Sequence, residues 1–226
     1  MARGRPARAI TAKPLRDAEA LLRKTEEPDF RQDRARRSYQ ALIEAATQLF
    51  SKLGYDAVGT PEIAQEAGVS VGTFYRYFDD KHEVYVEVAR RAMVDAYTAT
   101  IDGLTPARFV GRARHETISE TVALLFEHVL SRPQLSRSFS EMSLRDPAIG
   151  ELRRAFEQIS VERLATLITA IVPREVVPDP QATAYVLYGS AMQCAYGLAG
   201  HVGPPPVPPE RARAALTAFI ERALFP

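Results

Sequence analysis

The chain has one cysteine, four histidines and no long apolar run. The single cysteine, Cys194, excludes a disulfide framework within the chain, and cysteine spacing typical of zinc sites is absent. We expect Cys194 to be a small buried apolar side chain, and the alternative is that it is a sensor thiol. The scattered histidines offer no metal cluster, so we expect no cofactor.

A membrane-spanning helix needs about eighteen apolar residues, and the charged N-terminus lacks the apolar core of a signal peptide. We therefore expect a cytoplasmic protein.

The net charge of +1 hides a strong asymmetry along the chain. Residues 1–37 hold eleven Lys/Arg and six acidic residues, whereas residues 93–226 hold thirteen Arg and fourteen acidic residues. Positive charge that could meet phosphates is therefore concentrated at the front of the chain. Arg3-Gly4-Arg5-Pro6 resembles the core of an AT-hook, which lays arginines into a narrow A·T minor groove. The alternative is a flexible tail with incidental charge.

Residues 63–81 read IAQEAGVSVGTFYRYFDDK, the pattern of two short helices separated by a tight turn. Gly68 can adopt positive φ and end the first helix, and Ser70 is a candidate N-cap for the second. Phe74 and Phe78 lie one helical turn apart and should point inward together. Asp80 should cap a third helix, with a capping-box partner at Glu83. This is the layout of a helix-turn-helix, whose second helix enters the major groove of DNA.

A further helix precedes this motif. Its apolar stripe predicts roughly four turns that end near Gly54, and the stripe comprises Tyr39, Leu42, Ile43, Ala46, Leu49 and Phe50. Thr60 and Pro61 fit the N-cap and first residue of the next helix, although Gly59 could be the cap instead. The sequence thus predicts a three-helix DNA-binding domain.

This segment resembles the DNA-binding domain of the TetR (tetracycline-repressor-like) family of bacterial transcriptional regulators. The resemblance covers about a quarter of the chain, and the matching residues are Gly54-Tyr55, Ile63-Ala64, Ala67-Gly68-Val69-Ser70, Gly72-Thr73, Tyr75, Tyr77-Phe78 and Lys81. The family usually has Thr or Ser and then a small apolar residue before the second helix, where this chain has Gly59-Thr60. The resemblance implies a ligand-responsive homodimeric regulator, in most relatives a repressor, on a palindromic operator. Its expected partners are double-stranded DNA and a small apolar or aromatic effector.

The same resemblance, together with the helix-turn-helix geometry, assigns expected DNA contacts. Phosphate anchors that fix register are expected at Thr73, Tyr77 and Lys81, with Ser70, Thr60 and Arg36 as further phosphate contacts. Base edges are expected to meet Val71, Gly72, Tyr75 and Arg76. Gly72, which lacks a side chain, should let the helix backbone approach DNA closely.

The remaining sequence predicts helices only, giving an all-α fold of about nine helices. We expect a basic extension (1–33), the DNA-binding domain (34–80), and a ligand-binding and dimerisation domain (81–226) entered by one long helix over 81–101. The helix over 181–198 is apolar nearly all round, so it should be covered, with the helix over 209–225, by a second subunit. The alternative is that both helices are only core.

Helices between residues 106 and 172 should enclose an effector pocket. The candidate lining residues, each of which could instead be core packing, are Phe126, His128, Phe139, Met142, Phe156, Tyr188 and Met192.

One motif indicates a different function. Residues 68–72 match the G-x-S-x-G nucleophile elbow of hydrolases, but that motif needs a preceding strand, and no acid–histidine pair follows. We therefore expect no enzyme. Two further alternatives are a helical bundle with surface tyrosines and a TetR-fold protein that binds DNA constitutively and serves a protein partner.

Overall fold

The computed structural model describes residues 19–20, 33–111 and 113–226, and these residues form helices and no strand. The all-α prediction is therefore confirmed. The predicted basic arm around Arg3-Gly4-Arg5-Pro6 lies outside the described residues. No helix in the described part is long and apolar enough to cross a membrane.

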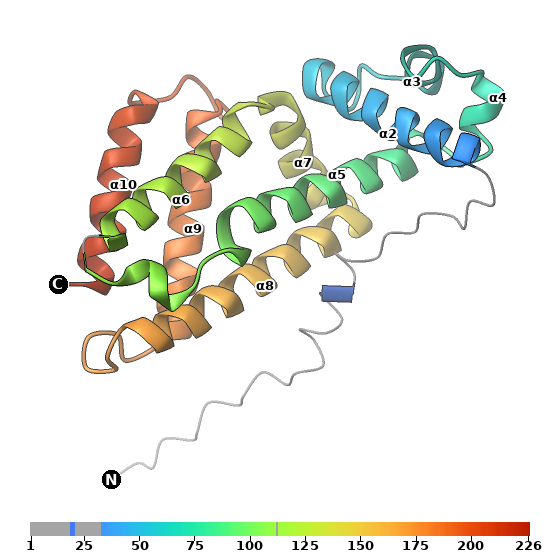
Figure 1. The fold of residues 1–226 in the computed structure, drawn as a ribbon. Coiled ribbons are helices and arrows are strands. Elements are labelled where there is room, and N and C mark those ends of the chain that lie inside the picture. The colour runs from blue at the N-terminus through green and yellow to red at the C-terminus, as the bar shows by residue number, and fades with distance from the viewer. Residues whose placement is uncertain (1–18, 21–32, 112) are drawn as a thin grey trace, which may run out of the picture.

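Three helices at one end of the molecule form the helix-turn-helix unit (Figure 1): α2 (Asp33–Leu53), α3 (Thr60–Glu66) and α4 (Val71–Phe74). The helix α2 has 21 residues, longer than the four turns predicted. Its apolar stripe begins only at Tyr39, and the exposed polar turns before it carry no periodic signal. The cap of α3 is Gly59, the second of the two candidates.

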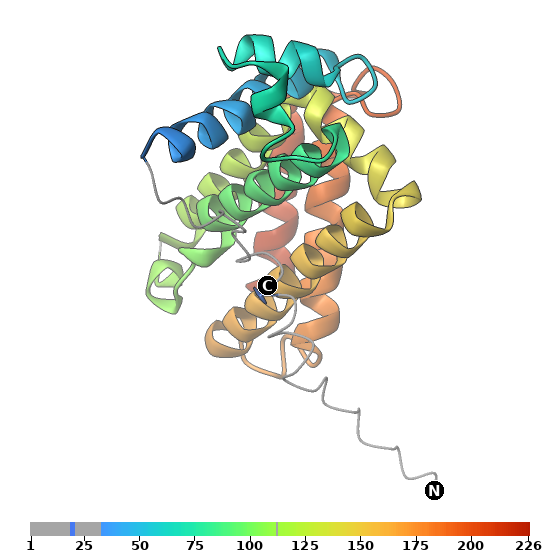
Figure 2. The ribbon, with the colours of Figure 1, turned by 90° about the vertical axis from the view of Figure 1, so that its right-hand side faces the viewer.

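The helix α5 (Lys81–Tyr97) leaves this unit and runs beside α8 (Pro147–Ile171), as Figures 1 and 2 both show. The predicted single helix over 81–101 is interrupted, because the chain continues from α5 as a π-helix, η1 (Thr98–Asp102). The buried hydroxyl of Thr100 donates to the Ala96 carbonyl at 2.6 Å. A π turn of this kind is often found at functional sites.

The other helices pack around α5 and α8. A short 3-10 helix, η2 (Pro106–Phe109), comes first, where the sequence predicted a helix restart, and then α6 (Ala113–Leu130), α7 (Pro133–Arg145), α9 (Pro180–Leu198) and α10 (Pro209–Leu224). The helix α7 lies against α2, while α6, α9 and α10 gather at the end away from α3 and α4 (Figure 1).

One apolar core joins the two halves of the molecule. It begins with Phe50 and Phe74 in the helix-turn-helix unit and continues through Tyr85 and Met93 of α5 to Phe156 of α8. Two smaller clusters lie among α6, α8, α9 and α10. The predicted domain boundary at residues 80–81 therefore lies within a continuous core, in which α5 packs against α2.

Candidate DNA interface and internal cavity

The turn between α3 and α4 follows the local signals in the sequence. Gly68 has a φ of +66°, a conformation that side chains disfavour, and it reverses the chain after α3. The Ser70 hydroxyl accepts the backbone N–H of Thr73 at 3.1 Å, so Ser70 is the N-cap of α4. The G-x-S-x-G pattern thus follows a helix rather than a strand, and its serine serves as a helix cap.

The two faces of α4 and the turn after it differ sharply. Phe74 is fully buried and Phe78 nearly so, and Phe78 stacks on Tyr39 of α2 at 5.3 Å between ring centroids. The predicted base-contact residues, by contrast, are all exposed: Val71, Gly72, Tyr75 and Arg76. Thr73 and Tyr77 are half-buried at the edge of this surface. The outward surface of α4 is therefore free to enter a groove.

Tyr75 is oriented by the neighbouring helix. Its hydroxyl lies 3.0 Å from the Thr60 hydroxyl at the start of α3, and 54% of the residue remains exposed. Arg36 is also exposed, on the first turns of α2. These predicted contacts belong to the same helix-turn-helix unit.

Lys81 has a structural role that the sequence did not reveal. Its ammonium donates to the carbonyls of Tyr55 and Val58 at 3.0 and 2.9 Å and lies 4.4 Å from the Tyr55 ring centroid. The first turn of α5 therefore holds the loop between α2 and α3. As predicted, Asp80 caps α5 by accepting the N–H of Glu83 at 2.9 Å, but the Glu83 carboxylate accepts from Asp79 rather than from Asp80.

Polar contacts also tie the helix-turn-helix unit and α5 to α7 and α8. The N–H of Tyr55 donates to the Ser138 hydroxyl at 3.2 Å, and the His82 ring lies 2.8 Å from the Asp146 carboxylate. Asp146 also caps α8 through the N–H of Ile149. Burial alone would raise the pKa of Asp146, but that N–H and the His82 ring together hold it below its usual value.

A cavity of about 420 Å³ lies between α5, α6, α8 and α9, within the size range of small-molecule sites. Five of the seven predicted lining residues border it: His128, Phe139, Phe156, Tyr188 and Met192. The prediction was wrong for Phe126 and Met142. Phe126 is buried among the side chains of α6, α9 and α10, and Met142 is buried in the core shared with α2 and α5.

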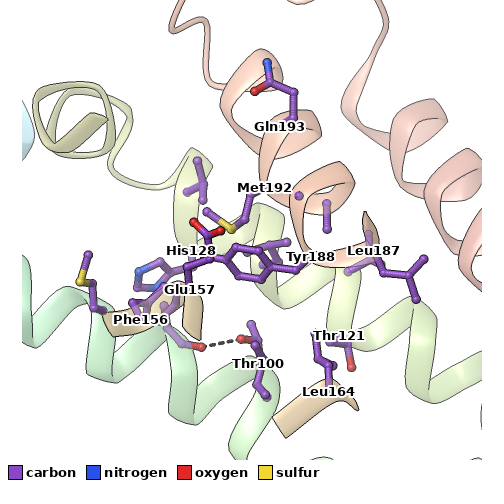
Figure 3. A pocket seen from close by; sticks show the side chains of 18 of the residues that line it. Thr100, Thr121, His128, Phe156, Glu157, Leu164, Leu187, Tyr188, Met192 and Gln193 are labelled. Atoms are coloured by element: carbon purple, nitrogen blue, oxygen red, sulfur yellow. Dashed lines mark hydrogen bonds between the residues drawn. The ribbon is translucent and has the colours of Figure 1, made fainter. Parts of the chain in front are cut away.

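The cavity wall is mostly apolar with a few polar groups, as Figure 3 shows. Burial lowers the pKa of His128, and the nearby Arg132 lowers it further, so this imidazole is mainly neutral at pH 7. Burial raises the pKa of the Tyr188 and Tyr196 hydroxyls, which remain protonated donors.

The sequence interpretation missed several polar lining residues: Thr100, Thr121, Arg153, Glu157, Gln193 and Tyr196. The π turn in η1 places Thr100 at the wall, and no periodic pattern predicts such a turn. Arg153 and Glu157 could have been noticed, because they lie four residues apart on α8 and Arg153 lies three residues before Phe156, so Arg153 shares a face with each of them.

The helices α9 and α10 leave apolar side chains exposed. Tyr185 and Val186 of α9 are 58% and 53% exposed, and Phe219 of α10 is 45% exposed. Exposed apolar side chains that form a contiguous patch are typical of interaction sites. Over the described residues, no group of three or more histidine, cysteine or acidic side chains could hold a metal ion.

Comparison with known proteins gives a consistent picture. The profile of a family described as "Bacterial regulatory proteins, tetR family" matches residues 42–88, from within α2 to within α5. The Transposon Tn10 TetC protein of Escherichia coli is 29% identical over 164 residues, which covers 71% of this chain and 76% of that protein. The HTH-type transcriptional regulator RutR of the same species (strain K12) is 27% identical over 159 residues, covering 69% and 73%. A TetR-family regulator from Streptomyces coelicolor shares the fold, with a TM-score of 0.64, 19% identity, and coverage of 83% of this chain and 80% of that one.

Proposed function

Since the chain belongs to the TetR family of bacterial transcriptional regulators, we propose that it is a homodimeric repressor that a small molecule releases from its operator. It acts in the cytoplasm on a near-palindromic site. Each subunit places α4 in one major groove, and the two subunits read successive turns of the duplex.

The DNA contacts follow from the exposed surface of α4. Arg76 can read a guanine through two hydrogen bonds. Thr73 and Tyr77 anchor phosphates at the edge of that surface, while Lys81 steadies the loop before α3 and uses its remaining N–H for a phosphate. The other proposed contacts are Arg36, Thr60, Ser70, Val71, Gly72 and Tyr75.

A second copy of the chain would cover the exposed apolar surface of α9 and α10. Tyr185, Val186 and Phe219 supply its large side chains, and the exposed Gly189 allows helices to approach closely. Burying such side chains is the main driving force of association. A twofold dimer also matches a palindromic operator.

The observation that carries the regulatory proposal is the position of α5. Its first turn holds the loop before α3 through Lys81, while its later turns, through Ala89, Met93 and Ala96, form one wall of the cavity. A molecule that fills the cavity and shifts α5 would move the helix-turn-helix unit with it, because they share a core. The two α4 helices would then no longer fit successive grooves together, and affinity for DNA would fall.

The first test is a footprint of the purified protein on DNA upstream of its own gene, with Arg76→Ala as the control. We expect protection of about fifteen to thirty base pairs with near-palindromic sequence, and the control should need roughly 5–150-fold more protein for the same protection. Small molecules that raise the thermal unfolding temperature are then added to the complex. Release of DNA by a cavity-binding compound supports the proposal, whereas binding that no such compound alters would favour constitutive action through a protein partner.

A further inference from the structure

The cavity wall carries a carboxylate without a partner. Glu157 of α8 lines the cavity and is half-buried, and within the described residues its side chain makes no hydrogen bond or ion pair. Arg153 lies one helical turn before it, but the Arg153 guanidinium donates to the Ser143 hydroxyl of α7 at 2.9 Å. A partly buried charge without a partner gains from pairing with an opposite charge, so such a group is a candidate for binding a cation.

Glu157 points into the space that a ligand would occupy. Figure 3 shows its carboxylate near the Tyr188 ring, with Met192 of α9 beside it. Its charge, after burial and Tyr196, helps raise the pKa of the Tyr188 hydroxyl. The carboxylate therefore lies beside aromatic and apolar side chains of the cavity wall.

The surrounding wall suits a cation. Six phenyl or phenol rings line the cavity, and the faces of such rings attract positive charge: Phe109, Phe139, Phe156, Tyr185, Tyr188 and Tyr196. His128 does not compete for the carboxylate as a cation, because burial keeps its ring mainly neutral at pH 7. Arg132 is exposed, so water screens its charge.

On the basis of the proposed function, we infer that the effector is an apolar molecule bearing a cationic nitrogen, a protonated amine or a quaternary ammonium, which pairs with Glu157. The nitrogen lies against the carboxylate and the Tyr188 ring, and the apolar body fills the space lined by Phe156, Leu164 and Met192. An anionic effector, held by Arg153, is the opposite outcome that the experiment distinguishes.

Three probes with one apolar tail and different head charges test this inference: phenylbutylamine, phenylbutanol and phenylbutyrate. Calorimetric titration of the full-length protein at pH 7 should give the amine an affinity about tenfold or more above that of the alcohol, with the carboxylate weakest. Glu157→Gln, which keeps the shape and removes the charge, should reduce the amine to the level of the alcohol. The alcohol should bind this variant as before, which shows that its cavity is intact.

Glu151→Gln is the matched control, because Glu151 lies on the same helix but is exposed; it should leave the amine's advantage unchanged. An amine that binds no tighter than the alcohol, or whose affinity survives Glu157→Gln because Arg153 already neutralises the carboxylate, overturns the inference. In either case, binding of the alcohol or the carboxylate would still support the cavity as the effector site. If none of the three probes binds at millimolar concentration, the inference is overturned, while the proposed DNA binding is judged separately by the footprint.

Discussion

Gly72 offers a sharp test of how α4 meets DNA. It is the second residue of α4, it is exposed, and its φ is not in the positive region where glycine is favoured. A methyl group added at Gly72 would meet only the Ser70 hydroxyl oxygen, at an ordinary contact distance of 3.8 Å. The fold of the free protein therefore does not require glycine at this position.

The change Gly72→Ala should separate stability from DNA binding. Alanine is favoured over glycine in a helix by up to about 1 kcal/mol, so the free energy of unfolding should stay the same or rise slightly. The added methyl group lies on the surface proposed to face DNA. If the backbone of α4 approaches the duplex there, the methyl group displaces the helix and DNA affinity should fall by about tenfold or more, equivalent to about 1.4 kcal/mol.

The assay combines urea unfolding with fluorescence anisotropy on the footprinted operator. Gly68→Ala is the control, because Gly68 has positive φ and open space around it. It should lower the free energy of unfolding by about 1–2 kcal/mol, while the folded fraction still binds DNA. Wild-type affinity in Gly72→Ala would refute the close approach of α4, and a marked loss of stability would show that the fold does need this glycine.

Three further predictions follow from other residues. Arg76→Ala should weaken operator binding by about 1–3 kcal/mol and relax the preference at one base pair. If a competition assay shows that binding to every DNA sequence is weakened equally, Arg76 contacts a phosphate instead of a base. Lys81→Ala should lower the free energy of unfolding by about 1–3 kcal/mol, because the Tyr55 and Val58 carbonyls lose their donor. It should also weaken binding to all DNA sequences equally and make that binding less dependent on salt. Wild-type stability in urea would contradict the structural role of Lys81. Burial lowers the pKa of His128 below its ordinary 6.5, so below that pH the unfolded state binds a proton more readily than the folded state, and the free energy of unfolding falls. Urea unfolding between about pH 7.5 and pH 5.5 should therefore show a smaller fall in the free energy of unfolding for His128→Gln than for the wild type. An equal fall in both proteins would contradict this role of His128.

Local signals were enough to predict the helix-turn-helix. Gly68, Ser70 and Asp80 act through backbone torsion and hydrogen bonds to residues within three positions, so their neighbours in sequence determine their roles. The burial of Phe74 and Phe78 also follows from their spacing on one face.

Contacts between distant segments could not be predicted in this way. Lys81 has the spacing of a phosphate anchor, yet its two carbonyl partners lie 26 and 23 residues earlier in the chain. Periodicity shows which face of a helix is apolar but not whether a neighbouring helix fills the space beside it. For this reason Phe126 and Met142 could not be distinguished from lining residues such as Phe156.

The central claim, that filling the cavity weakens DNA binding through α5, is tested most directly by thermodynamic linkage. A compound that binds the free protein is titrated into the protein alone and into the protein saturated with its operator. The account predicts that the compound binds the DNA complex about 5–150-fold more weakly, and that it weakens DNA binding by the same factor. Equal affinity of the compound for the free and the DNA-bound protein would contradict the coupling between cavity and helix-turn-helix.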